Sequence, residues 1–329
     1  MYRNTSAETR PELLAVVMEA QFADDKFIAE AVLPTFPSET RVGDYLKIPK
    51  AEGQLLATDG SDALLRAPGT AYKQTGRTFT KDGFNCLDRG LEEPVDDVNA
   101  ADIARFFDAE SASARMCHRN VRLAYEQRVK GIMFDTGTWG AAIAPSVNYT
   151  LANGAPNAAT PFDFIKDMKA MKRKVGKRGE QPNSMILTEP LWDLVQQSLL
   201  VRQYFFGQNG GNAAVTEELI AQALGLAQIL VGRASYSSAK RNAAVTDAML
   251  NYVWTPDYIW MGEIKGGAPE EGGAGRTFLW VGDSPELFTV ETYRREDIRS
   301  DVVRVRQDTD EKIVNASSGL LLLTGSDAS

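Results

Sequence analysis

A stretch of chain without proline or glycine does most to limit what this sequence can fold into. Residues 95–130 contain neither residue type, and Asn99 can cap a helix whose first turn holds Asp102. Apolar side chains recur there at intervals of three, four or seven residues: Ile103, Phe107, Ala114, Cys117, Val121, Ala124 and Ile132. The pattern predicts one helix over 99–134, about 50 Å long. A helix of that length must be a spine that other layers cover.

The segment 41–92, which precedes the predicted helix, has little from which to build a core of its own. RVGDYLKIPK predicts a strand with Val42, Leu46 and Ile48 on one side, and AYKQTGRTFT predicts a second strand. The chain between them is small and polar, and long loops without a core are uncommon inside compact domains. One interpretation is a loose surface hairpin. The other, which we favour, is a projecting hairpin that packs on a neighbouring subunit.

The remaining segments have more ordinary patterns. Residues 1–40 predict an arm with one short amphipathic helix, followed by extended chain at VLPTFP, because its prolines break a helix. Residues 136–160 are rich in Gly, Ala and Asn and predict a linker. Residues 155–270 alternate helices with apolar strands, which favours a compact α/β or α+β unit. From Arg276 onward the sequence predicts strands, among them DVVRVRQ with its valines on one face.

Local signals divide the compact unit further. SMILT predicts a short buried strand, and an apolar stripe beginning at Phe164 predicts a helix that ends near Gly176. Thr188 and Thr216 are placed to cap two later helices, and Gly225 is placed to end the second of them.

The residues that enzymes use for nucleophilic or metal chemistry are scarce. The chain has one histidine, His118, and on a helix its neighbour Cys117 would point about 100° away from it. No segment matches a zinc site, a phosphate-binding glycine loop or a nucleophile elbow. We therefore predict no catalytic residue, no cofactor and no metal, although an α/β enzyme built on a pair of carboxylates stays open. The two cysteines, Cys86 and Cys117, predict reduced thiols.

The net charge and the basic residues limit the classes of partner that this chain is expected to bind. The formal net charge is -8, whereas a surface that grips nucleic acid is normally basic. The densest basic stretch runs from Lys166 to Arg178 and predicts a solvated helix face; a charged rim that meets acidic residues of a neighbouring subunit is the alternative. No apolar run approaches the roughly 20 residues needed to span a bilayer, so we expect no membrane contact.

Three stretches resemble one family of proteins. VLPTFPSETRVGDYLKIPK (32–50) is similar to the segment that leads into its extended loop, FIKDMKAMKRKVGKRGEQPNSMILTEPLWDLV (164–195) to the start of its second domain, and REDIRSDVVRVRQDTDEKIVNASSGLLLLTG (295–325) to its closing strands. The order of elements along the whole chain also resembles this family, the HK97-like major capsid proteins of tailed bacteriophages. The resemblance implies an α+β fold with an N-terminal arm (1–40), an extended E-loop hairpin (41–92), a P-domain with the spine helix (93–155), an A-domain (156–270) and P-domain return strands (271–329).

The same resemblance implies a function. Members assemble in the host cytoplasm, as hexamers and pentamers of one chain, into the icosahedral virion capsid that encloses the double-stranded DNA genome. Expected partners are a portal protein, a decoration protein in some members and packaged DNA through non-specific contact. A separate scaffolding protein is also expected, since only about thirty residues precede VLPTFP. The alternative within the fold is an encapsulin-like nanocompartment shell. We expect contacts between subunits at Tyr45, Lys47, Leu55, Leu56, Leu65, Arg66, Tyr72 and Arg77.

Overall fold

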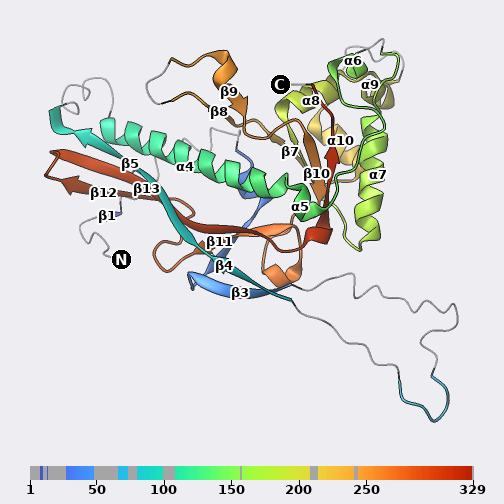
Figure 1. Ribbon diagram of the computed structural model, residues 1–329, viewed down its shortest axis with the longest axis horizontal. Coiled ribbons are helices and arrows are strands. Elements are labelled where there is room, and N and C mark those ends of the chain that lie inside the picture. The colour runs from blue at the N-terminus through green and yellow to red at the C-terminus, as the bar shows by residue number, and fades with distance from the viewer. Residues whose placement is uncertain are drawn as a thin grey trace.

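Two sheets and one long helix organise the protein (Figure 1). The computed structural model describes residues 8–9, 13, 27–47, 66–72, 80–98, 108–155, 158–207, 214–240 and 244–327. The long helix packs on the larger sheet. The smaller sheet stands at the C-terminal end of this helix and carries the shorter helices.

The larger sheet contains six strands within the described residues, in the order β1-β12-β13-β11-β2, with β5 paired to the other edge of β13. In chain order they are β1 (Glu8–Thr9), β2 (Thr35–Ser38), β5 (Leu87–Asp96), β11 (Gly275–Trp280), β12 (Thr289–Arg295) and β13 (Ser300–Ile313). The alternation predicted in DVVRVRQ is confirmed, because Val303 and Val305 are buried while Arg304 and Arg306 lie on the opposite face.

The spine helix α4 (Ala109–Met133) begins later than predicted. Asp108 has an extended backbone, and its side chain accepts a hydrogen bond from the N–H of Glu110 at 3.3 Å, so Asp108 rather than Asn99 caps the helix. The predicted first turns, 99–107, lie outside the described residues. At 1.5 Å per residue α4 is about 38 Å long. Neither α4 nor any other described helix is long and apolar enough to span a membrane.

The buried face of α4 follows the predicted stripe only over its first half. Cys117 and Val121 are buried as predicted, but farther along Tyr125 and Val129 are buried where the pattern named Ala124. These residues continue an i+4 row, the ridge with which α-helices commonly pack.

The smaller sheet has the order β14-β10-β6-β7. Its strands are β6 (Ser184–Thr188), β7 (Gln228–Gly232), β10 (Tyr258–Gly262) and β14 (Gly319–Leu323). β6 is the predicted buried strand SMILT, whereas β14 leaves the other return strands and pairs antiparallel with β10. The unit predicted over 156–270 is therefore completed by chain from outside that range, because strand pairing depends on partners that a local pattern does not reveal.

Helices cover one face of the smaller sheet and form the second hydrophobic core with it. They are α7 (Phe164–Lys177), α8 (Glu189–Gln197), α9 (Leu199–Phe206) and α10 (Glu217–Leu224). Thr216 caps α10 as predicted, with its Oγ1 3.4 Å from the N–H of Leu219, and Gly225 ends α10 in the left-handed region at φ 61°. Thr188 occupies the predicted N-cap position of α8, although its side chain makes no capping bond to that described helix.

The predicted linker 136–160 is, in its described part, a packed connection. It contains α5 (Thr136–Trp139) and α6 (Leu151–Gly154), and both Trp139 and Tyr149 are buried. Trp139 meets Trp260 of β10 edge-on, with 5.5 Å between ring centroids. The face of the smaller sheet that carries Trp260 therefore joins the core beneath α4.

Two smaller features lie beside α4. α2 (Ala29–Val32) packs against it, just before β2. β8 (Ser235–Ser237) and β9 (Leu250–Tyr252) form a hairpin that belongs to neither sheet and stands above α4 in the view of Figure 1. β9 ends at Tyr252, and Trp254, two residues later, is buried in the core.

Both cysteines are predicted to resist alkylation in the folded subunit. Burial raises the pKa of Cys86 and that of Cys117 to about 11 each, so roughly one thiol in a thousand is ionised at pH 8. Iodoacetamide at pH 8 should leave both unmodified for hours and label both once guanidinium has unfolded the chain. Rapid labelling of the native subunit, followed by mass spectrometry, would contradict the buried positions.

Candidate assembly interface

β3 (Val42–Lys47) and β4 (Thr80–Asn85) form the base of the projecting hairpin. β4 overlaps the predicted strand AYKQTGRTFT only at Thr80, and residues 73–79 of that prediction lie outside the described residues. β5 begins directly after Cys86 and pairs with β13, so residues 87–92 belong to the larger sheet rather than to the hairpin, and the predicted boundary at 92/93 falls inside β5. Between β3 and β4 the structure describes residues 66–72, the tip of the projection, which lie well away from the body (Figure 1).

An aromatic cluster fixes the base of the hairpin to the larger sheet. Phe278 of β11 stacks on Phe84 of β4 with 4.3 Å between centroids and 4° between planes. The ring centroid of Tyr45, on β3, lies 5.2 Å from that of Phe278. Gly43 is required beside Phe84, since a Cβ there would come within 2.8 Å of the ring. Each aromatic pair adds about 0.5–1.5 kcal/mol beyond burial. The base is therefore held as part of the body.

Polar contacts hold the two strands of the base together. The Tyr45 hydroxyl donates to Asp82 Oδ2 at 3.2 Å, and Lys47 forms an ion pair with the same carboxylate. Burial and the charge of Asp82 raise the pKa of Tyr45 well above its ordinary value, so Tyr45 stays a hydrogen-bond donor. At the other end, Arg41 Nε donates to the carbonyl of Cys86 at 2.9 Å.

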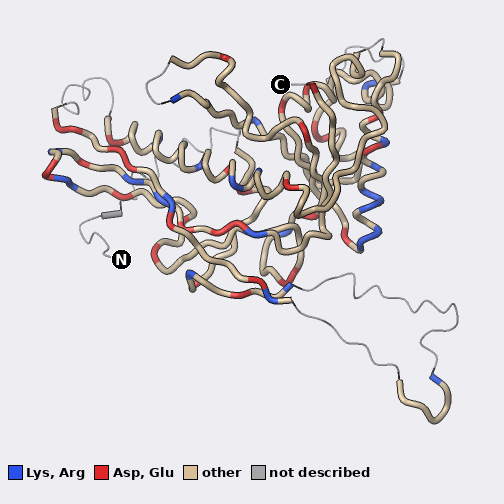
Figure 2. The backbone as a smooth tube through the Cα atoms, viewed as in Figure 1, with Lys and Arg blue, Asp and Glu red and all other residues tan. Residues whose placement is uncertain are grey.

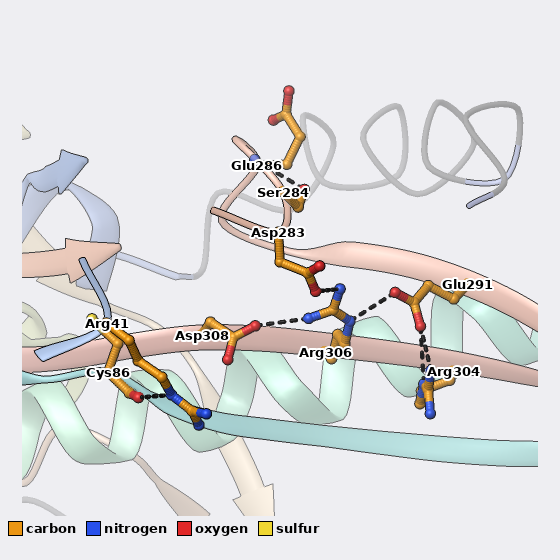
Figure 3. Close-up of polar contacts among 9 residues, drawn as sticks. All are labelled: Arg41, Cys86, Asp283, Ser284, Glu286, Glu291, Arg304, Arg306 and Asp308. Atoms are coloured by element: carbon orange, nitrogen blue, oxygen red, sulfur yellow. Dashed lines mark hydrogen bonds and ion pairs between the residues drawn. The ribbon is translucent and has the colours of Figure 1, made fainter. Parts of the chain in front are cut away.

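Three carboxylates surround the guanidinium of Arg306 beside the hairpin base (Figure 3). Arg306 Nε donates to Glu291 Oε1 at 2.8 Å and Nη1 to Asp308 Oδ2 at 2.7 Å, and the group also pairs with Asp283. Glu291 accepts in addition from Arg304. The network joins β12, β13 and the turn between β11 and β12.

The pKa values of two carboxyl groups in this network are shifted in opposite directions. Burial alone would raise the pKa of Glu291, but hydrogen bonds from Arg304 and Arg306 bring it below its ordinary value. Burial and the nearby charge of Asp88 raise the pKa of Asp308, despite its contact with Arg306. Folding therefore favours the ionised form of Glu291 and disfavours that of Asp308.

The described tip of the projection is a small organised turn. The N–H of Thr70 bonds to the carbonyl of Ala67 at 3.1 Å, with Pro68 second and Gly69 third at φ 83°, which is the pattern of a type II turn. Arg66 Nη1 donates to Thr70 O at 2.8 Å, and its guanidinium lies 4.7 Å above the ring of Tyr72. Every residue of 66–72 is exposed, Tyr72 by 74%.

The predicted contact residues fall into three groups. Tyr45 is buried against its own chain and Lys47 is bound to Asp82, so both position the hairpin base. Arg66 and Tyr72 lie exposed at the tip. Outside the described residues lie Leu55, Leu56, Leu65 and Arg77.

The side of β3 that carries Val42 and Leu46, with Asp44 between them, faces outward in the single chain. Val42 is 64% and Leu46 36% exposed, while Tyr45 on the opposite side is buried. Leu87 and Leu91 of β5 are exposed as well. Clustered apolar side chains that a single chain leaves in water favour contact with another surface.

The basic stretch on α7 is divided between internal bonds and solvent. Lys172 Nζ donates to the carbonyls of Leu224 and Gly225, which end α10, and Lys169 and Arg178 also bond within the chain. Several segments of α7 are coloured as basic residues in Figure 2. The basic residues of α7 that are exposed are Lys166, Arg173, Lys174 and Lys177. The predicted solvated face and the predicted charged rim both remain predictions.

The sequence reading missed Arg276, a fully buried residue of β11. Its guanidinium donates to the backbone carbonyls of Gly266, Gly267, Ala268, Gly272 and Gly275. The loop that it organises includes the 3₁₀ turn η3 (Pro269–Glu271), which packs against β3. Arg276 thus supports the hairpin base; an arginine that directly follows a glycine-rich loop and opens an apolar strand was the available signal.

The single histidine has a structural environment. His118 is buried on α4 with its ring edge-on to Phe288 at 4.8 Å, and burial together with Arg122 lowers its pKa to about 4. Within the described ranges, no group of three or more His, Cys, Asp or Glu side chains is arranged to hold a metal ion.

Comparison with known proteins gives matches in structure alone. No family model matches the chain, and no curated protein sequence matches it. A phage-related protein from Bordetella bronchiseptica RB50 is 17% identical, with a TM-score of 0.66 over 96% of this chain and 97% of that one. The capsid structure of the cyanophage P-SCSP1u is 10% identical (TM-score 0.54, 100% and 91%). A virus-like particle from Pyrococcus furiosus is 9% identical (TM-score 0.55, 95% and 98%).

These matches run over nearly the entire chain. The protein therefore has the α+β fold of HK97-like capsid proteins, which confirms the predicted fold class.

Substitutions in the arginine network should differ in cost according to the direction of each pKa shift. Glu291→Gln removes a charge that folding favours and should lower the free energy of unfolding by about 2–3 kcal/mol at pH 7. Asp308→Asn, whose Oδ1 can still accept from Arg306, should cost less than about 1 kcal/mol.

Urea unfolding of the unassembled subunit measures both effects. The pKa of Glu291 is lowered in the folded chain, so its contribution is full at pH 7 and shrinks as the pH falls below its ordinary value of 4.5. An equal cost for the two variants at pH 7 would contradict this account of the network.

Proposed function

We propose that this chain is the major capsid protein of a tailed bacteriophage, which assembles with copies of itself into the icosahedral shell around the double-stranded DNA genome. The supporting observation is the contrast within one hairpin. Its base is built into the body by Phe278 and its neighbours, whereas the described tip 66–72 is wholly exposed. A rigid base with an organised but uncovered tip suits a segment that is covered by another copy.

The likeness in fold favours a phage shell over the alternatives. The capsid of a cyanophage, a structure named Mycobacterium phage Adephagia and the capsid of an empty GTA particle share the fold over 91–100% of this chain at TM-scores above 0.5. The encapsulin-like nanocompartment is the second candidate within the same fold. Assembly as hexamers and pentamers in the host cytoplasm, with a separate scaffolding protein, a portal protein and a decoration protein in some shells, belongs to the proposal. Negative-stain electron microscopy of the expressed protein tests it, since closed shells are expected and persistent monomers would contradict it.

Deleting residues 52–69 should separate folding from assembly. Residues 48–51 and 70–79 remain to join β3 to β4, and the aromatic cluster at the base is untouched. We expect a soluble subunit whose unfolding midpoint lies within a few degrees of wild type but which forms no shells, because it has lost the area that neighbours would cover. Normal particles from the deletion variant would show that the hairpin has no role in assembly.

A further inference from the structure

A buried carboxylate on the spine helix, that of Glu126, is bonded to segments far away in the chain. Its Oε1 accepts from the N–H of Ile28 at 3.0 Å and from the indole N–H of Trp254 at 2.6 Å. Its Oε2 accepts from the N–H of Ala29 at 2.9 Å. The side chain is fully buried. Bonds from N–H donors to an ionised carboxylate are about twice as strong as neutral ones.

Two of the donors belong to the end of the N-terminal arm. Ile28 is the N-cap of α2, and this described helix has no capping bond from that residue's side chain. Glu126 therefore satisfies the first two amides of α2 from a different helix. Arg122 of α4 also contacts this segment: it lies 4.7 Å above the ring of Phe27, and it donates to the partly exposed Glu30 at 3.2 Å, a pair that adds little stability.

The third donor belongs to the β8–β9 hairpin. Trp254 follows β9 closely, and the N–H of Val253 bonds to the carbonyl of Ala234 at 2.8 Å to close the hairpin base. The indole lies tightly against Gly232, where an added Cβ would come within 2.3 Å of the ring, and edge-on to Phe134 at 5.1 Å. These contacts hold the indole of Trp254 in the position in which its N–H donates to Glu126.

Most of the β8–β9 hairpin is exposed. Both residues that flank Tyr236 in β8 and all three of β9 are exposed, and Leu250 is 51% exposed despite being apolar. An isolated two-stranded hairpin is marginally stable in water. Its direction relative to the body therefore depends on its attachment at Val253 and Trp254.

We propose that Glu126 is a pin: from one point on the spine helix it fixes the position of the segment 27–32 and that of the base of the β8–β9 hairpin, and assembly needs both positions. The inference rests on the proposed function, since only a protein surrounded by its copies depends on them. Burial raises the pKa of Glu126 and its three donors oppose that rise, so the site is costly unless all its bonds are made. An apolar residue would avoid this cost but leave three buried N–H groups without acceptors.

Glu126→Gln tests the pin with little change in shape. The amide places an NH2 group where one carboxylate oxygen stood, so at least one donor faces another donor. Hydrogen exchange on the unassembled subunit should be about tenfold or more faster in the peptide 27–33, while the peptide 184–188 in the second core is unchanged. Glu30→Gln is the matched control: it makes the same chemical change on α2, at a partly exposed ion pair, and should alter exchange less than about twofold.

Trp254→Phe provides a second variant in case Glu126→Gln does not fold. It keeps an aromatic ring in the pocket and removes only the indole N–H. Exchange should rise in the peptide 250–254 and stay near the wild-type rate in 27–33, because Ile28 and Ala29 keep their acceptors.

Particle formation by the same variants decides the role in assembly. We expect missing or malformed shells from Glu126→Gln and normal shells from Glu30→Gln. Unchanged exchange in 27–33 for Glu126→Gln would overturn the pin whatever the particles look like, and faster exchange with normal particles would overturn its role in assembly. If wild-type protein forms no shells at all, the proposed function is wrong, and so is the role of Glu126 in assembly. The exchange result would still decide whether Glu126 acts as a pin.

Discussion

Pairing along both edges of β13 is the interaction on which the rest of the structure depends. β12 and β11 occupy one edge and β5 the other, and α4 covers the sheet that results. Arg89 of β5, for example, bonds to Thr309 of β13 across 220 residues of sequence. The hairpin base is positioned by the same strands, because β11 carries Phe278 and β5 continues directly from β4. Without this pairing the hairpin base would have no fixed position on the body.

Buried charged side chains also position segments of the chain. Glu126 acts on the segment 27–32 and on the base of the β8–β9 hairpin, and Arg276 acts on the loop beside β3. Burying such groups costs free energy that apolar side chains would not. The buried charged groups also make directional hydrogen bonds. Each set of bonds fixes the geometry of a segment that buries too little apolar area to be held by packing alone.

Three parts of the surface that the single chain leaves in water are candidates for contact with other copies. The outward side of β3 presents Val42 and Leu46, the tip at 66–72 presents an arginine stacked on a tyrosine, and α7 presents basic side chains. Arginine and tyrosine are enriched among residues that dominate binding energy at interfaces, and an ordered turn lowers the entropy lost when such a tip docks. Together these surfaces favour contacts that are made with several neighbours, each of modest size.

The sequence alone determined the local features of this protein: the helical spine, the buried strand SMILT, the cap at Thr216 with the end at Gly225, and the alternating faces of β13. Each of these depends on residues within a turn or two of one another. Only the tertiary structure decided that α4 starts at Ala109, that β14 joins the smaller sheet and that Tyr45 is buried. A glutamate on the apolar face of a helix could have been noticed at position 126, but not its partners. Those partners lie about a hundred residues away in the sequence, and periodicity carries no information over such distances.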